Sequence, residues 1–312
     1  MTPTEGGGRR SSLLAPLLAF GLAALFAAAL FFTLDLAALR AALANARYEY
    51  LIMAAAFTVA TLFVDSAKFV IFFQKIKPAY FWDSFRAGYF GFFIANTGLG
   101  QIGADAYRVA LLRLHVGGAA LGTQLVILVR GAGLAITLLI ATVAVTLVGG
   151  ASDGLNFRAQ DIALLAVAAL AIALVGVLLA RLLLRRFALK IDLQAQRNWV
   201  MSWRTPVLIG LCALTDVFRF ATIYAAMAAT GISLDPATVV FITAMTTIVT
   251  LLPISFHGLG AREATLTGLM VLQLVDPAAA SASAILSRLV MVLTAAPGGF
   301  FVDLRLRDRK RS

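Results

Sequence analysis

The sequence predicts an all-α, polytopic membrane protein, and three observations support this fold class. Hydrophobic residues make up 61% of the 312-residue chain and charged residues only 13%, with a mean hydropathy of +0.93. A soluble domain usually contains about 25% charged residues. Several apolar stretches reach the ~20 residues that a helix needs to cross a hydrocarbon core of ~30 Å. The alternation in segments of ~10 residues that is typical of a membrane barrel is missing from the sequence.

The apolar stretches predict about six full spans and two interrupted blocks. The spans are expected at about 12–32, 50–73, 118–148, 161–184, 205–230 and 279–302. The first run is too long for a signal-peptide core and lacks a clear cleavage site, so we expect a retained helix. The blocks at 81–113 and 237–275 are apolar runs broken at their centres by glycines and charges. Because the polar pieces are short, we expect residues 1–312 to form a single integral membrane domain.

Lysine and arginine predict the orientation through the positive-inside rule. One side collects Arg9, Arg10, Lys75, Lys77, Arg181, Arg185, Arg186, Lys190, Arg197, Arg204 and the tail "RLRDRKR". The other side has only Arg40, Arg47 and Arg158, which are offset by acidic residues. We therefore expect the first side, and both termini, to be cytoplasmic. This bias accounts for the net charge of +11, so we expect no nucleic-acid partner.

The two interrupted blocks resemble each other, which indicates an internal repeat. The first carries "NTGLGQIGADAYR" from Asn96 and the second carries "SFHGLGARE" from Ser255, with Gly-Leu-Gly at 98–100 and 258–260. Each block follows a span that holds an Asp, a base three residues later and then Phe, in "VDSAKF" and "TDVFRF". Arg130 and Arg288 follow the two glycine motifs by 32 and 30 residues. The copies, at about 50–148 and 205–302, have opposite orientation, as in many transporters.

The glycines suggest that each block is a re-entrant hairpin. We expect each block to enter the membrane as a half-helix, to turn at its glycines, and to leave on the same side. Pro253 limits the helix that precedes the second turn. The start of each returning half-helix then presents free N–H groups, which form an anion site. The charge bias is equally compatible with two complete spans in each block.

Ionisable residues inside spans are candidates for function, because burying them in hydrocarbon is unfavourable. Arg130 and Arg288 have no acidic neighbour within a turn, so each needs a partner elsewhere in the fold or a ligand. His257 lies at the supposed second turn, where a hydrogen bond that holds the turn is favoured over proton handling. The candidate substrate-binding residues are Asn96, Gly98, Gly100, Gly103, Asp105, Arg108, Arg130, Ser255, His257, Gly258, Gly260, Arg262, Glu263 and Arg288. The candidate coupling residues are Asp65, Lys68, Asp216 and Arg219, which could equally neutralise each other as pairs three residues apart.

Signatures of enzymes are scarce in this sequence. Two histidines and one cysteine provide no cluster suited to zinc. The chain has no Asp-x-x-x-Asp motif near a membrane face, no Gly-x-Ser-x-Gly elbow and no P-loop. Cys212 lies inside an apolar run, so no internal disulfide forms. We expect a protein that is not an enzyme and that needs no cofactor and no metal.

Two motifs resemble those of a known family. "LLPISFHGLGAREA" resembles the Leu-Pro-Ile-Ser…Gly-Gly-x-Gly-x-Arg-Glu signature of the lysylphosphatidylglycerol synthase transmembrane domain family, or flippase-like domain, with His257 where many members have glycine. "NTGLGQIGADAYRVALL" resembles the family's Asn-x-x-x-Pro-x-x-x-Gly-(Asp/Glu)-x-x-Arg motif, although the proline is missing. Arg130 matches the arginine of the following span. The resemblance extends over about residues 45–302.

The resemblance implies a lipid flippase. In full-length members this domain carries aminoacylated phosphatidylglycerol across the membrane, and a soluble synthetase domain follows it. Without that domain, a stand-alone translocator of an anionic phospholipid or lipid-linked headgroup in a bacterial inner membrane is expected. Candidate partners are a second copy of the chain and lipid-synthesis enzymes. The alternatives are a secondary transporter of a small soluble anion and a non-transporting component of a hopanoid or polyprenyl-glycolipid pathway.

Overall fold

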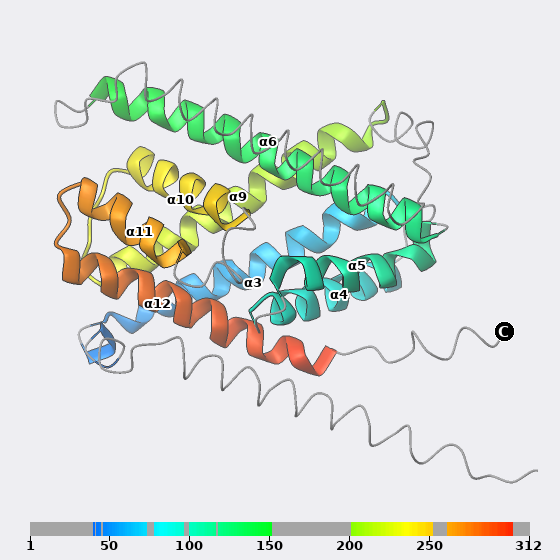
Figure 1. Ribbon diagram of the computed structural model, residues 1–312, viewed down its shortest axis with the longest axis horizontal. Helices are drawn as coiled ribbons and strands as arrows, with labels where there is room; N and C mark the ends of the chain where they lie inside the picture. The colour runs from blue at the N-terminus through cyan, green and yellow to red at the C-terminus, as the bar shows by residue number, and fades with distance from the viewer. Residues whose placement is uncertain are drawn as a thin grey trace, which may run out of the picture.

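The computed structural model describes residues 40, 42–44, 46–73, 78–96, 100–116, 118–151, 201–251 and 261–301. Its elements within these ranges are helices, with no strand among them. In order they are α3 (Tyr48–Val70), α4 (Pro78–Asn96), α5 (Gly100–Val116), α6 (Ala119–Ala151), α9 (Arg204–Ala229), α10 (Pro236–Leu251), α11 (Ala261–Leu272), α12 (Pro277–Ala295) and the 3-10 helix η2 (Ala296–Phe301) (Figure 1). The expected spans at 12–32 and 161–184 lie outside the described residues.

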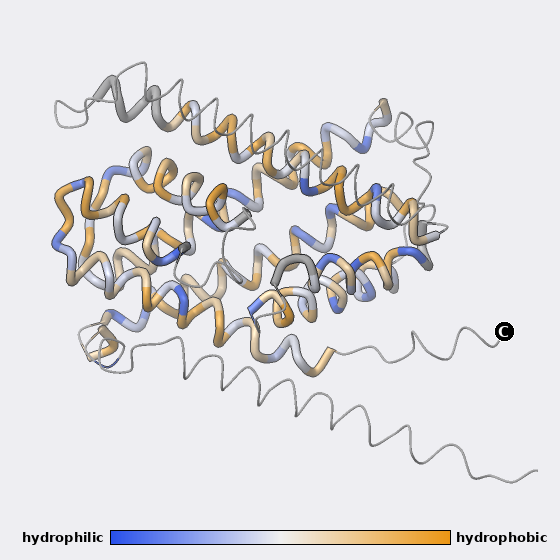
Figure 2. The backbone as a smooth tube through the Cα atoms, viewed as in Figure 1, coloured by the Kyte–Doolittle hydropathy of each residue, from blue (hydrophilic) through white to orange (hydrophobic). Residues whose placement is uncertain are grey.

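Four helical stretches are long and apolar enough to cross a membrane. They cover Tyr48–Val70, Ala119–Ala144, Arg204–Ala229 and Pro277–Phe301. These stretches coincide with four of the predicted spans, and they confirm that the chain is an all-α, multi-pass membrane protein. Orange segments predominate along these helices in Figure 2, and blue segments also lie within the bundle, away from its ends.

Each interrupted block consists of two separate helices in the structure. In the first block, α4 ends at Asn96 and α5 begins at Gly100. In the second block, α10 ends at Leu251 and α11 begins at Ala261. The glycine turns themselves, at 97–99 and 252–260, lie outside the described residues. In each block the two described helices pack against each other.

The arrangement of the helices places the two blocks at opposite ends of the bundle. Helices α3 and α9 pack extensively against each other at the centre, and α6 and α12 lie on either side of them (Figure 1). The α4–α5 pair lies at the right of Figure 1 and the α10–α11 pair at the left. Both α5 and α11 begin near the middle of the bundle and run outward, so that their N-terminal ends face the interior.

Two Asp-Pro pairs start the helices on one side of the bundle. Asp235 precedes α10 and accepts hydrogen bonds from the backbone N–H (2.9 Å) and the hydroxyl (3.0 Å) of Thr238. Asp276 precedes α12 and accepts from the N–H of Ala279 at 3.0 Å. An N-terminal Asp satisfies one of the free N–H groups of the first turn, and proline fits the first helical position. The sequence thus sets both helix starts locally.

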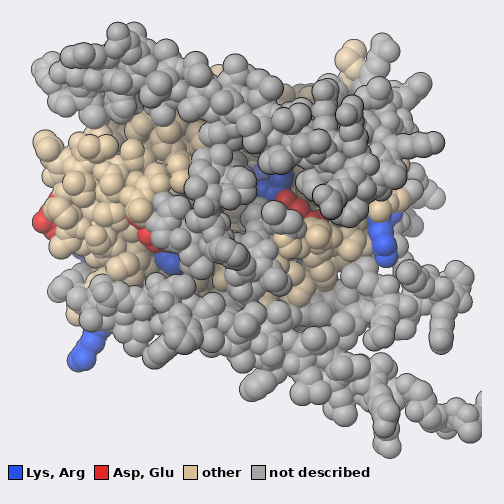
Figure 3. Space-filling model, viewed as in Figure 1, with Lys and Arg blue, Asp and Glu red and all other residues tan. Residues whose placement is uncertain are grey.

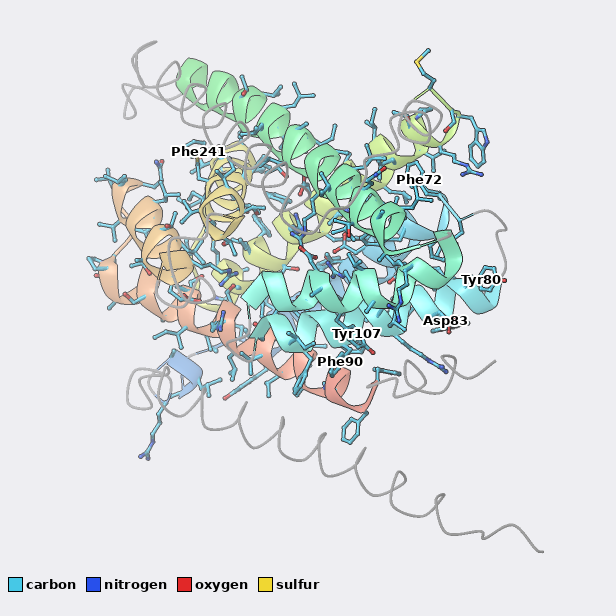
Figure 4. All side chains as sticks on the ribbon, turned by 45° about the vertical axis from the view of Figure 1, so that its right-hand side comes forward. Phe72, Tyr80, Asp83, Phe90, Tyr107 and Phe241 are labelled. Atoms are coloured by element: carbon cyan, nitrogen blue, oxygen red, sulfur yellow. The ribbon has the colours of Figure 1, made fainter. Side chains whose placement is uncertain are left out.

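Aromatic packing holds the first block together and attaches η2 to it. The rings of Phe90 on α4 and Tyr107 on α5 meet edge to face, with 4.5 Å between centroids and an interplanar angle of 63°. Figure 4 shows the two residues side by side. Gly298 of η2 lies against the carbonyl of Tyr89, so close that an added Cβ would be 2.6 Å from that oxygen. The absence of a side chain at Gly298 therefore permits η2 to pack directly on α4.

Candidate functional site

The ionisable residues inside the bundle form two clusters. The first charged cluster joins four helices and contains Asp65 and Lys68 (α3), Asp105 and Arg108 (α5), Arg130 (α6), and Asp216 and Arg219 (α9). The second charged cluster contains Arg262 and Glu263 (α11) and Arg288 (α12). Figure 3 shows basic and acidic side chains next to each other near the middle of this face.

On the two central helices, each Asp pairs with the base that follows it by three residues. Lys68 Nζ is 2.7 Å from Asp65 Oδ1, and Arg219 Nη1 is 3.2 Å from Asp216 Oδ1. The Lys68 side chain is only 6% exposed. A buried ammonium without an anion would be strongly destabilising, so this pairing is a condition for placing Lys68 inside the bundle. The ion pairs expected from the spacing are therefore present.

Threonines of neighbouring helices also contact the two aspartates. The hydroxyl of Thr215 on α9 lies 3.4 Å from Asp65 Oδ1 on α3 and 2.9 Å from the carbonyl oxygen of Leu211 on its own helix. Thr137 on α6 lies with its hydroxyl 2.9 Å from Asp216 Oδ2 on α9. These contacts tie α3 to α9 and α9 to α6. A single sequence gave no signal for them, because threonines are common in apolar helices.

Asp105 is the centre of the α5–α6 contact. Arg130 Nε lies 2.6 Å from Asp105 Oδ2, and Arg130 Nη2 donates to Oδ1 at 2.7 Å. Arg108 reaches the same Oδ1 at 3.4 Å and lies 5.9 Å from the centre of the Phe69 ring. The partner that Arg130 needs is thus a carboxylate of the same chain. Two guanidinium groups share this one carboxylate.

The second charged cluster also has two arginines around one carboxylate. Glu263 Oε1 is 3.7 Å from Arg262 Nη1 and 3.9 Å from Arg288 Nη1. Arg262 also donates from Nη2 to the hydroxyl of Ser287 at 2.8 Å, whereas its Nη1 has no hydrogen-bond partner within the described ranges. Both arginine side chains are 8% exposed. Arg262 is the second residue of α11, so its charge adds to the positive end of that helix.

The other residues proposed from the sequence lie near the block centres or beyond the described chain. Asn96 is buried at the end of α4, where its Nδ2 donates to the carbonyl of Phe92 at 2.8 Å and its Oδ1 has no hydrogen-bond partner within the described part. Gly100 and Gly103 lie in the first turn of α5. The remaining candidates, all outside the described residues, are Gly98, Ser255, His257, Gly258 and Gly260.

The structure does not bring Arg130, Arg262 and Arg288, three of the candidate substrate-binding residues, to one point. Arg130 belongs to the first charged cluster, whereas Arg262 and Arg288 belong to the second. Thr137 and Ser287 are site residues that the sequence did not reveal. Over the described ranges, no group of three or more His, Cys, Asp or Glu is placed to hold a metal ion.

A hollow lies next to the first charged cluster, between α6, α9 and α10. It has a volume of about 90 Å³. Its lining combines apolar side chains with three threonines and one carboxylate: Thr137, Ile140, Asp216, Val217, Phe220, Val240, Thr243, Ala244 and Thr247. Val217 is 55% exposed, so this hollow reaches the outer surface of the bundle.

Helices of membrane-spanning length, interrupted blocks and buried charge define a polytopic helical membrane protein with a polar interior. The family described as the lysylphosphatidylglycerol synthase TM region matches residues 16–298. The chain belongs to this family, and it is therefore a membrane protein associated with lipid handling. No significant match was found among curated proteins or among solved structures.

Proposed function

We propose that the protein moves a lipid with an anionic headgroup across a bacterial inner membrane. The lipid is a phospholipid or a lipid-linked headgroup. The single observation that carries this proposal is the second charged cluster, in which two buried arginines face one carboxylate at the N-terminal end of α11. The family's association with lipid handling supports the same conclusion.

The charge balance of this cluster favours an anionic ligand. Arg262, Arg288 and Glu263 together carry one net positive charge, and both arginines are almost fully buried. An uncompensated charge inside a membrane bundle is unfavourable and marks a substrate path by default. Guanidinium groups remain charged and bind phosphate through two parallel hydrogen bonds. Arg262 Nη1, which has no hydrogen-bond partner in the described structure, is available to such a ligand.

The architecture of the proposed carrier is an inverted repeat. Helices α3–α6 form one copy and α9–α12 the other, with both termini in the cytoplasm. The two interrupted blocks are re-entrant hairpins that enter from opposite sides. Their helices have 19, 17, 16 and 12 residues, which exceeds half of a ~30 Å core at ~1.5 Å per residue, so the outer turns extend into the headgroup region. The N-terminal ends of α5 and α11 then face each other near the midplane.

A lipid carrier also needs a lateral route for its substrate. The headgroup must reach the buried arginines while the acyl chains stay in the bilayer. The hollow beside α10 has a largely apolar lining, reaches the bundle surface at Val217 and leads first to Asp216 of the first charged cluster. This arrangement favours a lipid over a soluble anion, which would need a site closed to hydrocarbon on every side. The proposed activity is transport and not catalysis, with a second copy of the chain or lipid-synthesis enzymes as partners.

Vesicles that contain the purified protein and a fluorescent anionic phospholipid test this proposal. A membrane-impermeant quencher reports the fraction of the probe in the protected leaflet. We expect protein-dependent loss of the protected signal, and loss of this activity in Arg262→Gln. Arg47→Gln is the matched control, because Arg47 is exposed at the start of α3. Saturable uptake of a soluble anion without any lipid movement would contradict the proposal.

A further inference from the structure

One hydroxyl in the first charged cluster lies between two oxygen atoms. The Thr137 Oγ1 is 3.0 Å from the carbonyl oxygen of Gly133, one turn earlier on α6, and 2.9 Å from Asp216 Oδ2 on α9. A threonine hydroxyl has a single proton to donate. It therefore donates to only one of the two oxygens at a time in a well-directed hydrogen bond.

The protonation state of Asp216 decides which of the two bonds is made. When Asp216 is ionised, its carboxylate accepts the Thr137 proton. When Asp216 is protonated, its own O–H donates to Thr137 Oγ1, and Thr137 turns its proton to the carbonyl of Gly133. In both states a hydrogen bond joins Thr137 Oγ1 to Asp216 Oδ2. Asp216 can therefore bind a proton without leaving a buried donor or acceptor unpaired between α6 and α9.

The surroundings of Asp216 allow a proton to reach its carboxylate, and they determine which residue that proton affects. Asp216 lies midway along α9, its side chain is 12% exposed, and it lines the hollow between α6, α9 and α10. Arg219, its ion-pair partner, has a side chain that is 39% exposed. Protonation of Asp216 removes the negative charge that neutralises Arg219. The guanidinium then keeps only Asp65, which is itself paired with Lys68, as an acidic neighbour in the described chain, and an anionic headgroup would restore the balance of charge.

The charged residues on the other helices packed against α9 already have partners of their own, so they do not replace Asp216 or Arg219 in this proton exchange. On α3, Lys68 acts electrostatically on Asp216 but is itself paired with Asp65. On α6 the ionisable residue is Arg130, which is paired with Asp105. Helix α10 carries no ionisable residue. On α12 the ionisable residue is Arg288, which pairs with Glu263 of α11 in the second charged cluster. A proton that binds Asp216 therefore changes the electrostatic surroundings of Arg219 first.

We propose that Asp216 is a proton-binding site that couples lipid movement to a proton gradient, with Thr137 as the hydroxyl that follows its protonation state. This inference rests on the proposed function. The proton binds Asp216 Oδ2, and the anionic headgroup neutralises Arg219 on its way to the arginines of the second charged cluster. The net charge of the pair is zero before both bind and zero after. Proton and headgroup therefore bind together and cross in the same direction.

The thermodynamic consequence is a lipid distribution that depends on the pH difference across the membrane. For one proton per lipid, a difference of one pH unit shifts the leaflet ratio of the probe by about tenfold, because one unit is one factor of ten in proton activity. Asp216→Asn keeps the shape of the protonated carboxyl and donates to Thr137, but it cannot exchange a proton. In this variant we expect the leaflet ratio of the probe to lose its response to the pH difference.

The experiment uses vesicles with the full chain, a fluorescent anionic phospholipid and an imposed pH difference in each direction. Thr142→Val is the matched control, because Thr142 is an exposed threonine of α6 that bonds only its own helix at 2.9 Å. Thr137→Val keeps the carboxylate and removes the hydroxyl, so we expect a reduced response if Asp216→Asn does not fold. An Asp216→Asn variant with the wild-type pH response would overturn the inference.

Two further results separate this inference from the proposed function. If the wild-type protein moves lipid but its leaflet ratio ignores the pH difference, the coupling is wrong and the carrier function stands. If no lipid moves, the proposed function fails. Infrared difference spectra between acid and neutral pH then test Asp216 by itself. A protonated-carboxyl band that is lost in Asp216→Asn and shifted in Thr137→Val supports the proton site, and a band that both variants leave unchanged overturns it.

Discussion

Asp105 and Arg130 are joined by two side-by-side contacts, with Arg130 Nε 2.6 Å from Oδ2 and Nη2 2.7 Å from Oδ1. The Nη2 contact is a charge-assisted hydrogen bond, which is about twice as strong as a neutral one, and the Nε contact is a close ionic one without hydrogen-bond geometry. The two residues are 25 positions apart, and the pair links the second helix of the first block to the following span. The relation is structural as well as electrostatic, since it fixes how α5 lies on α6.

Removing one partner of this pair is expected to destabilise the protein. In Asp105→Asn, the side chains of Arg130 and Arg108 lose the carboxylate that they share. We expect a loss of about 3 kcal/mol in the free energy of unfolding, at the lower end for a buried pair because a quarter of each partner's side chain is exposed. Thermal unfolding in detergent measures the effect. In the double variant Asp105→Asn/Arg130→Gln we expect partial recovery, and two additive losses would show that the pair is not coupled.

The second charged cluster predicts an asymmetry between its acid and its bases. After Arg262→Gln, Glu263 keeps Arg288 as a partner at 3.9 Å. After Glu263→Gln, two buried guanidinium groups remain without the carboxylate between them. We therefore expect Glu263→Gln to lower the free energy of unfolding by about 3–5 kcal/mol and Arg262→Gln by clearly less. The same detergent unfolding assay compares the two variants. Equal losses would contradict this charge balance.

The sequence predicted the features of the fold that depend on neighbours along the chain. Apolar length identified four spans, the glycines located the interruptions at Asn96–Gly100 and Leu251–Ala261, and the three-residue spacing gave the Asp65–Lys68 and Asp216–Arg219 pairs. Each of these depends on helix geometry alone, in which residues three apart share a face. The sequence is sufficient for such features.

The sequence alone could not predict which side chains make contacts between helices. Nothing in one chain shows that Arg130 faces Asp105, that Thr137 faces Asp216, or that Ser287 accepts from Arg262. These contacts depend on which helices pack together and on their rotation. For the same reason, the sequence grouped Arg130 with Arg262 and Arg288, although the structure divides them between two clusters.

Acid is expected to weaken the start of α10. The backbone N–H and hydroxyl of Thr238 bind the carboxylate of Asp235 and hold its pKa below the ordinary value of 3.8. A lowered folded-state pKa means that this contribution is present above the unfolded pKa of about 3.9 and is lost as the pH falls through the folded value. Asp235→Asn keeps the cap without the charge, so its unfolding should vary less with pH below about 4. Asp235→Ala removes the cap and lowers stability at neutral pH by about 1 kcal/mol. Identical acid profiles for the wild type and Asp235→Asn would contradict this role.

The contact of η2 with α4 predicts opposite effects for alanine at two glycines. A Cβ at Gly298 would lie 2.6 Å from the carbonyl oxygen of Tyr89 and 3.0 Å from the Cβ of Phe93, so the backbone of η2 has to move. Overpacking of this kind is destabilising by about 1–3 kcal/mol. Gly131 on α6 is the control, because a Cβ there meets nothing within 4 Å and alanine favours the helix by about 0.5–1 kcal/mol. Unfolding in detergent should therefore show a lower midpoint for Gly298→Ala and an unchanged or higher one for Gly131→Ala. A Gly298→Ala protein with the wild-type midpoint would mean that η2 does not rest on α4 in the membrane.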